Sequence, residues 1–453
     1  MAPHTPVTII GGGIAGCECA LQLATRGIPV TLLEMRPTVM GPAHRTDHLG
    51  ELVCSNSFKG TDPTSATGTL KSELERLGSH VMRAARTCAV PAGAALAVDR
   101  ECFARSLTES VGAHPLIEVV REEATSIPDG DVVVATGPLT SPGFERALTD
   151  LIGEKRLAFW DAAAPIVDAA TIDRSVVFAA SRYEKGGGAD YLNCPMDRET
   201  YERFISELVT ARRVTLKEFE TADLFQACQP IEEVARTGLD APRYGALKPV
   251  GLNDPRTGER PWAVVQLRPE NRALTAYNLV GFQTNLTFSE QRRVFSSIPG
   301  LRDAEFLRYG VMHRNTFIDA PRLLDATLAL HGDPRVRFAG QITGTEGYLE
   351  AAAGGLLTAL GLIAERTGSR QPVLPPTTAL GALIAYATDS QTTRYQPMHV
   401  NWGLVPPLEP PVRGKRARYV AYASRAAADL GEYLASTDSP PHEPCSERSG
   451  HAD

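Results

Sequence analysis

The feature that most constrains this chain is a glycine-rich turn near the N-terminus. The turn reads Gly-Gly-Gly-Ile-Ala-Gly at residues 11–16, after an apolar run at 7–10 and before small residues that continue to 24. A second apolar run covers residues 28–33 and ends at Glu34. A strand, a tight turn and a helix, with an acid about 20 residues further on, are typical of a dinucleotide-binding βαβ unit. We therefore expect a doubly wound, Rossmann-like α/β layer.

The spaced glycines have separate physical roles in such a unit. Gly11 permits the tight turn, Gly13 lets the backbone approach a pyrophosphate, and Gly16 lets the helix pack closely on the strand. Free N–H groups at the helix start bind phosphate oxygens, while Glu34 accepts hydrogen bonds from the adenosine ribose. A tight turn that binds nothing is the weaker alternative. The predicted nucleotide-binding residues are Gly11, Gly12, Gly13, Ile14, Ala15, Gly16 and Glu34.

Two later segments indicate which nucleotide binds. Residues 131–137 and 336–341 each read as a strand that runs into a turn, and a Gly/Ala-rich helix is expected from 348 to about 365. The first turn alone fits NAD, FAD or S-adenosylmethionine. Two further strand ends that return to the nucleotide are typical of FAD proteins. We expect FAD to be held additionally by Ala135, Thr136, Gly137, Gly340, Gln341, Gly347 and Tyr348.

The length and texture of the chain predict more than one structural unit. At about 150 residues per domain, 453 residues suggest two or three units. Aromatic and β-branched runs alternate with turn-rich loops between about 175 and 325, which favours an inserted α+β domain. We expect an FAD-binding domain at 1–174 and 326–436, the insertion at 175–325, and a disordered tail at 437–453.

The termini, charge and cysteines favour a cytoplasmic protein. The N-terminus shows no cleavable leader, and no window is expected to reach the roughly 20 apolar residues of a membrane span. The eight cysteines have neither paired zinc-binding spacing nor a secreted disulfide pattern, so we expect free thiols and no metal. A formal charge of −7 does not by itself indicate a nucleic-acid partner.

A series of short blocks extends from about residue 5 to residue 430. The most specific reads Leu-Val-Cys-Ser-Asn-Ser at 52–57, and another reads Cys-Gln-Pro-Ile-Glu at 228–232. Together with the glycine-rich turn, these blocks resemble the folate- and FAD-dependent tRNA (uracil-5-)-methyltransferases. The remaining blocks lie at 161–167, 190–196, 248–252, 281–286, 338–348 and 396–398.

The resemblance implies a reaction at C5 of the T-loop uridine of tRNA. The carbon would come from 5,10-methylenetetrahydrofolate, and NADPH or NADH would supply reducing equivalents through FAD. Uracil C5 is a poor nucleophile, so a thiolate must add at C6 and a base must remove the C5 proton. Cys54 and Cys228 fall in family blocks and are the implied catalytic thiols. We assign attack at C6 to Cys228 and proton transfer to Cys54, with the reverse order left open.

Several polar residues are candidates for the folate tail or the tRNA. We expect Tyr348 to stack on the pterin, although packing on the sheet is an equal alternative for that residue. Basic clusters at 212–213, 292–293 and 413–418 are candidates for phosphate contacts. Neither a membrane nor an obligate protein partner is expected. The substrate candidates are Arg182, Lys185, Lys248, Gln283, Asn285 and Arg314.

Two other functions compete with this interpretation. One is a related, larger flavoprotein that modifies the tRNA wobble uridine with a partner GTPase, for whose long C-terminal helical region 453 residues leave little room. The other is a non-catalytic flavin-binding protein, whose properties would not change when Cys54 or Cys228 is replaced. The sequence leaves open the preference between NADPH and NADH, the tRNA docking surface and the oligomeric state.

Overall fold

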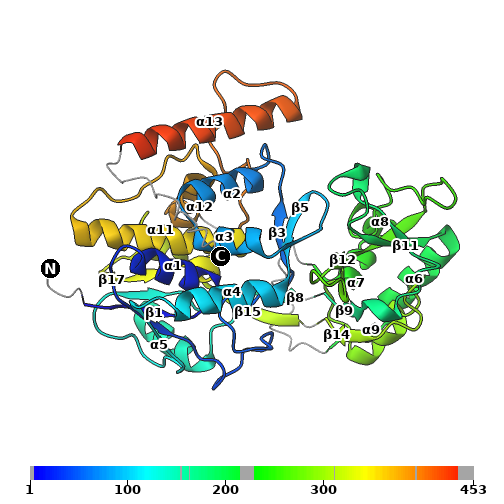
Figure 1. The fold of residues 1–453 in the computed structure, drawn as a ribbon, viewed down its shortest axis with the longest axis horizontal. Coiled ribbons are helices and arrows are strands. Elements are labelled where there is room, and N and C mark those ends of the chain that lie inside the picture. Colours follow the sequence, from blue (N-terminus) through cyan, green and yellow to red (C-terminus); the bar gives the residue numbers. More distant parts are fainter. Residues whose placement is uncertain are drawn as a thin grey trace, which may run out of the picture.

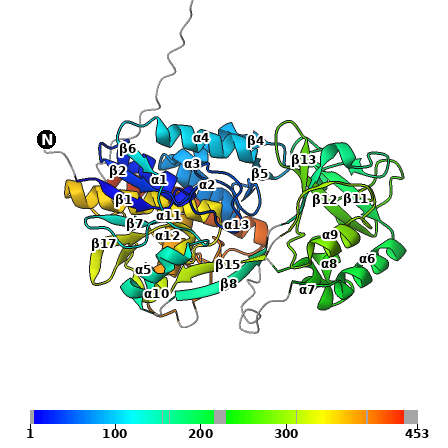
Figure 2. The same cartoon turned by 90° about the horizontal axis from the view of Figure 1, so that it is seen from below.

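Two β-sheets, each with its own hydrophobic core, organise the chain (Figure 1). The computed structural model describes residues 5–153, 156–162, 164–214, 229–310, 312–392 and 395–436, with backbone only at 156–162 and 312–314. The first sheet includes the N-terminal strand and the second consists of strands from the middle of the chain. Figure 2 shows the two units side by side from a second direction.

The first sheet is the expected doubly wound layer. Its order is β16-β17-β7-β1-β2-β6, and every pair is parallel except β16 with β17. The three strand ends that the sequence places at one nucleotide belong to the neighbouring strands β1, β7 and β17, so this fold class is confirmed. The bounds are β1 Val7–Ile10, β2 Val30–Leu33, β6 Ile117–Val120, β7 Val132–Val134, β16 Ala329–Leu330 and β17 Asp333–Phe338.

Glycines allow helices α1 and α11 to pack against the sheet and each other at very short distances. A Cβ on Gly16 would lie 1.9 Å from the Gly11 carbonyl oxygen, and one on Gly355 would lie 2.3 Å from the Ala15 carbonyl oxygen. All of α1 is buried as a result. The helices of this unit are α1 Ile14–Ala24, α2 Ala66–Arg76, α3 His80–Thr87, α4 Arg100–Gly112, α5 Pro142–Ile152, α10 Ala320–Leu323, α11 Tyr348–Thr367, α12 Ala379–Thr388 and α13 Lys415–Ser436.

Helix α11 corrects one expectation from the sequence. Its 20 residues are long and apolar enough to cross a membrane, whereas no such segment was expected. The apolar composition has another cause here, because 78% of its apolar 18-residue window is buried inside the protein, where the helix packs against α1. Among the described residues it is the only helix with this length and composition.

The second sheet has the order β10-β11-β12-β13-β9-β14. Helices α6, α7 and α9 bury its apolar face, which includes Val265 and Leu267. Because side chains alternate along a strand, Gln266 and Arg268 belong to the opposite face. The bounds are β9 Ile166–Asp168, β10 Phe178–Ala179, β11 Leu192–Met196, β12 Ala263–Pro269, β13 Ala276–Leu279, β14 Phe306–Arg308, α6 Arg198–Thr210, α7 Ile231–Arg236, α8 Ala241–Tyr244 and α9 Phe288–Phe295.

Two small sheets lie where the two units meet (Figure 1). One pairs β8, Arg156–Ala162, with β15, Met312–Ile318. The other has the order β3-β5-β4, with β3 at Ser57–Gly60, β4 at Ala89–Val90 and β5 at Ala95–Val98. The domain limits at 175 and 325 stay a prediction.

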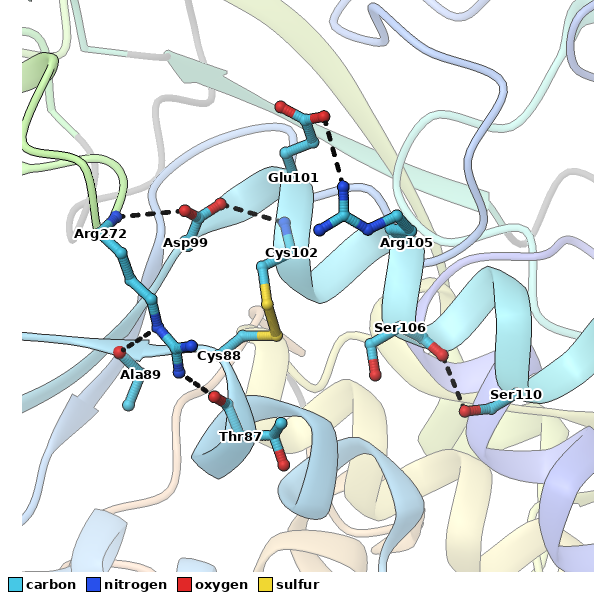
Figure 3. The surroundings of a disulfide bond; sticks show 10 residues. All are labelled: Thr87, Cys88, Ala89, Asp99, Glu101, Cys102, Arg105, Ser106, Ser110 and Arg272. Atoms are coloured by element: carbon cyan, nitrogen blue, oxygen red, sulfur yellow. Dashed lines mark hydrogen bonds and ion pairs between the residues drawn. A yellow bond between two sulfur atoms is a disulfide. The ribbon is translucent and has the colours of Figure 1, made fainter.

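A disulfide joins the end of α3 to the first turn of α4 (Figure 3). Cys88 and Cys102 are 14 residues apart in sequence, with their Cα atoms 5.7 Å apart. The expectation of free thiols was therefore wrong for this pair. The Asp99 N–H donates to the Cys88 carbonyl, and the Asp99 side chain caps α4, so tertiary packing brings the two cysteines together. Their spacing alone matches no disulfide pattern.

Reduction of this disulfide should lower the stability of the protein. Because the bond closes a short loop and restricts the unfolded chain, we expect the free energy of unfolding to fall by about 2–4 kcal/mol in dithiothreitol. Denaturant titrations with and without the reductant measure the difference. The Cys102→Ser variant serves as the control, because its stability should not respond to dithiothreitol. An equal response of the variant and the natural protein would contradict the pairing.

Candidate functional site

The glycine-rich turn joins β1 to α1 at the carboxyl edge of the first sheet. Gly11 has φ +106°, and a Cβ there would lie 2.6 Å from the Ala135 carbonyl oxygen. Gly13 is different, because a Cβ on it would meet nothing within 4 Å. Gly13 directly precedes Ile14, the first residue of α1, whose free N–H groups bind phosphate. The turn therefore fits the pyrophosphate of a dinucleotide.

Glu34 follows β2 and is held beside the turn. Its side chain accepts hydrogen bonds from the Gly12 N–H at 2.9 Å and from the Arg36 Nε at 2.7 Å. Arg36 is itself 2% exposed and also contacts Glu51 at 3.0 Å. Burial raises the pKa of the Glu34 carboxyl, but hydrogen bonds and charge from Arg36 outweigh it, so the pKa lies below its ordinary value. Glu34 is therefore ionised, which suits an acceptor for ribose hydroxyls.

A cavity of about 70 Å³ opens along this edge. It is lined by the glycine-rich turn, by Glu34 and Arg36, and by the end of β7 with Ala135 and Thr136. Gly137 follows with φ +64°. The first two FAD segments expected from the sequence therefore meet at one cavity, with an open approach to Gly13. Sequence reasoning missed Arg36, which has no marker apart from its place two residues after the acid.

The third segment connects β17 to α11. Gly340 has φ +78°, and a Cβ on it would lie 2.7 Å from the Cβ of Ala15, so this turn packs directly on α1. Gln341 donates from Nε2 to the Glu346 carboxylate at 2.5 Å. Gly347, with φ +123°, precedes Tyr348 at the first position of α11. The segment is thus placed beside the start of α1 and carries Tyr348 at a helix N-terminus.

The cysteine-containing block at 52–57 contacts this third segment. The Cys54 N–H donates to the Tyr348 hydroxyl oxygen at 2.9 Å. Cys54 is half-buried, and burial raises the pKa of the Tyr348 phenol, with a further contribution from Cys54. A hydroxyl that stays protonated keeps its own proton for a second partner while accepting from Cys54. The structure therefore brings together the two sequence blocks that carry the predicted thiol and the predicted stacking residue.

Two arginines hold the carbonyl groups of the Cys54 loop. Arg100, the first residue of α4, donates to the Leu52 and Cys54 carbonyl oxygens, the latter at 2.8 Å. Arg308 donates to the Val53 carbonyl oxygen at 2.8 Å. Both guanidiniums, and that of Arg268, interact electrostatically with Cys54. Positive charge around a cysteine favours the thiolate.

A partly buried ion pair lies next to this loop. The Lys59 Nζ lies 2.7 Å from the carboxylate of Glu350, which is fully buried in the first turn of α11. The Lys59 Nζ also lies 2.9 Å from the His399 Nδ1. Lys59 adopts φ +65°, which few non-glycine residues do. The pair ties β3 to α11, and the sequence did not mark either residue.

Four predicted substrate residues belong to the second unit, and their contacts with a substrate stay a prediction. Arg182 donates to Gln266 and to the Val250 carbonyl, and burial lowers the pKa of its guanidinium. Lys185 is exposed, and Lys248 lines a separate cavity. Asn285 is 8% exposed, and its backbone N–H donates a hydrogen bond to the Glu232 carboxylate at 2.7 Å.

Gln283 and Asn285 lie beside the second cysteine block. The Gln283 carbonyl accepts from the Ile231 N–H at 2.8 Å at the start of α7. This joins the 281–286 block to the 228–232 block. Cys228 itself lies outside the described residues, as does the side chain of Arg314.

Three other thiols are buried in the core, and two arginines of the basic clusters form ion pairs. Burial raises the pKa of Cys17 to about 12 and also raises the pKa of Cys19 and Cys194, so these three thiols are inert. Arg213 pairs with Glu233, while Arg293 pairs with Glu207 and Glu290. These two arginines are therefore partly neutralised.

The chain matches a family model described as glucose inhibited division protein A over residues 6–369. It is 55% identical over 431 residues to the methylenetetrahydrofolate--tRNA-(uracil-5-)-methyltransferase TrmFO of Heliobacterium modesticaldum, which covers 95% of this chain and 98% of that protein. Identity to the TrmFO of Geobacter sulfurreducens is 54% over 430 residues, with 95% and 99% covered. Among solved structures, GidA of Aquifex aeolicus in the form II crystal has a TM-score of 0.68 at 16% identity, covering 95% of this chain and 74% of that one, which shows the fold alone.

A Gly13→Ala substitution should separate cofactor binding from folding. The added methyl group meets no protein atom within 4 Å, and φ −76° suits alanine, so the fold should tolerate the change. A pyrophosphate in close contact with this backbone would be displaced, and we expect FAD affinity to fall about tenfold or more. Flavin fluorescence during titration measures the affinity.

Gly112→Ala is the matched control, because a Cβ on this last residue of α4 also meets nothing within 4 Å. That variant should bind FAD as the natural protein does. If Gly13→Ala binds FAD with undiminished affinity, the pyrophosphate does not bind at this turn.

Proposed function

The chain belongs to the family of glucose inhibited division protein A and to the methylenetetrahydrofolate--tRNA-(uracil-5-)-methyltransferases, and from this membership we propose that it methylates C5 of the T-loop uridine of tRNA. The carbon donor is 5,10-methylenetetrahydrofolate and the cofactor is FAD. NADPH or NADH supplies the reducing equivalents in this proposal. We also propose that the enzyme works in the cytoplasm.

The observation that carries the proposal is the contact between the Cys54 loop and Tyr348. A thiol, a flavin and a place for the folate are the minimal requirements of the chemistry. The hydrogen bond from the Cys54 N–H to the Tyr348 hydroxyl fixes the thiol-bearing loop beside the helix that follows the third FAD segment. This arrangement supports a thiol that works next to the flavin rather than a thiol that only fills a core.

The residues of the first sheet suit the binding of FAD. The Gly11–Gly16 turn and the start of α1 are placed to hold the pyrophosphate, and ionised Glu34 to accept from the ribose. When bound, FAD supplies the hydride that turns the transferred carbon into a methyl group. Tyr348 would offer its aromatic face to the pterin.

The two cysteines have different roles in the reaction at the uracil ring. In our proposal the Cys228 sulfur forms a bond to C6, which places negative charge on C5 and lets C5 attack the methylene carbon. Cys54 then accepts the proton that leaves C5, and the bond between the transferred carbon and the folate nitrogen breaks, which releases tetrahydrofolate. Once a hydride has reached the exocyclic carbon, the bond between C6 and sulfur breaks and the product is released. Arg100 and Arg308 support this role, because they bring positive charge to the backbone of the Cys54 loop.

Modification of the tRNA wobble uridine is the competing activity within this fold. The likeness to Aquifex aeolicus GidA shows only a shared fold, and this chain covers 74% of that protein. The position of the modified base in the tRNA distinguishes the two activities. Nucleoside analysis after digestion with a sequence-specific ribonuclease should place the methyl group in the T-loop fragment and leave the anticodon fragment unmodified.

Replacement of either catalytic cysteine should abolish methylation while FAD remains bound. We expect Cys54→Ala and Cys228→Ala to lower the rate about a hundredfold or more, because each removes a group that handles a bond or a proton. The assay combines unmodified tRNA, methylenetetrahydrofolate and NADPH without S-adenosylmethionine. Flavin absorbance reports cofactor content, and mass spectrometry with 5-fluorouridine RNA identifies the cysteine that carries the adduct.

Cys194→Ala is the matched control, because the Cys194 thiol is fully buried in β11 and should not contribute. Methylation at the natural rate by both Cys54→Ala and Cys228→Ala would show that neither thiol takes part in the reaction. No methylation by the natural protein with FAD bound would leave a flavin-binding protein without this activity.

A further inference from the structure

Arg268 lies in a polar row that crosses the second sheet. Across the paired strands, Arg268 of β12 is opposite Asn278 of β13, which is opposite Ile166 of β9, which pairs with Arg308 of β14. Residues that are directly opposite in a sheet share a face. This face meets the Cys54 loop, because the Arg308 guanidinium donates to the Val53 carbonyl and Asn278 contacts Asn56.

The guanidinium of Arg268 has no partner among the described residues. The side chain is only 8% exposed, and its Nε is fully buried without a hydrogen bond. No ion pair or hydrogen bond of its other nitrogens occurs in the described part of the chain. Buried arginines are ordinarily paired, since an uncompensated buried charge costs several kcal/mol.

Glu270 interacts electrostatically with Arg268 but is already engaged by other groups. Glu270, 5% exposed, pairs with Arg100 and accepts from the Asn278 amide. Burial lowers the pKa of Arg268 and of Arg308, which is the direction expected where positive charge is not fully compensated. Arg100 and Arg268 therefore share the Glu270 carboxylate, and Arg308 adds a third guanidinium at the Cys54 loop. This cluster has an excess of positive charge that an anionic ligand would balance.

We propose that Arg268 binds an oxyanion of a substrate, beside Cys54. The inference rests on the proposed function, because both of its substrates carry such groups: phosphodiesters in the tRNA and carboxylates in the folate glutamate. A guanidinium binds either group through two parallel hydrogen bonds, and water exclusion at a buried site strengthens them. Arg268 is thus a substrate-binding residue separate from the thiols.

The experiment compares Arg268→Gln, Arg268→Lys and the control Arg302→Gln, whose arginine is exposed in the same unit. Dissociation constants for unmodified tRNA are measured without folate over a range of salt. Michaelis constants are measured for methylenetetrahydrofolate and for its pteroate analogue, which lacks the glutamate. Binding of tRNA needs no turnover, so this arm is informative even if the proposed methylation fails.

We expect Arg268→Gln to weaken the binding of one of the two substrates about tenfold or more, because a charge-assisted pair of hydrogen bonds is lost. A weaker tRNA complex with a salt slope smaller by about one identifies a phosphate. A raised Michaelis constant for the folate that disappears with the pteroate analogue identifies a carboxylate. Arg268→Lys should recover only part of the affinity, because an ammonium lacks the planar fork.

A stability measurement separates binding from a structural role. Without substrates, Arg268→Gln should unfold at the same or a higher temperature than the natural protein, because an uncompensated buried charge has been removed. A lower unfolding temperature with loss of FAD would overturn the proposal. Unchanged affinities for both substrates would overturn it as well.

Discussion

The site depends on how closely α1 approaches the turn that follows β1. At Gly16 a side chain would overlap the Gly11 carbonyl, and at Gly355 it would overlap the Ala15 carbonyl, so the sheet, α1 and α11 form a tightly packed stack of backbone. This stack places the free N–H groups of α1 and the first residue of α11 near one edge of the sheet. Without those two glycines the helices would move outward, and Gly13, Glu34 and Tyr348 would no longer share an edge.

The Cys54 loop depends on the second sheet as much as on the first. Its backbone is held by Arg100 from α4 and Arg308 from β14, while the Asn56 amide donates to the carbonyls of Val98 and Pro269. A loop fixed from both units keeps its thiol at a set place relative to Tyr348. The same contacts bury several arginines together, which explains why charge is locally in excess although the whole chain is acidic. The same contacts therefore fix the position of the Cys54 thiol and create the positive charge that would attract an anion.

The sequence predicted the local features of the fold and little of its long-range pairing. The strands at 7–10, 28–33 and 131–135 and both glycine-rich helices follow from apolar runs and glycine spacing, which are properties of neighbouring residues. Arg100 and Glu270 are 170 residues apart, and Lys59 and Glu350 are 291 apart, so no local pattern marks either pair. The disulfide and the burial of α11 were missed for the same reason. Arg182 bonds Gln266 and the Val250 carbonyl, and its role toward a substrate stays a prediction.

The origin of the new methyl group tests the account most directly. Methylenetetrahydrofolate labelled with ¹³C at the methylene carbon is supplied with unmodified tRNA, NADPH and the FAD-loaded protein, with unlabelled S-adenosylmethionine present. Mass spectrometry of the digested tRNA then measures the label in 5-methyluridine. We predict that the nucleoside is labelled to the same extent as the folate. Unlabelled 5-methyluridine, formed only when S-adenosylmethionine is added, would contradict the folate-dependent reaction.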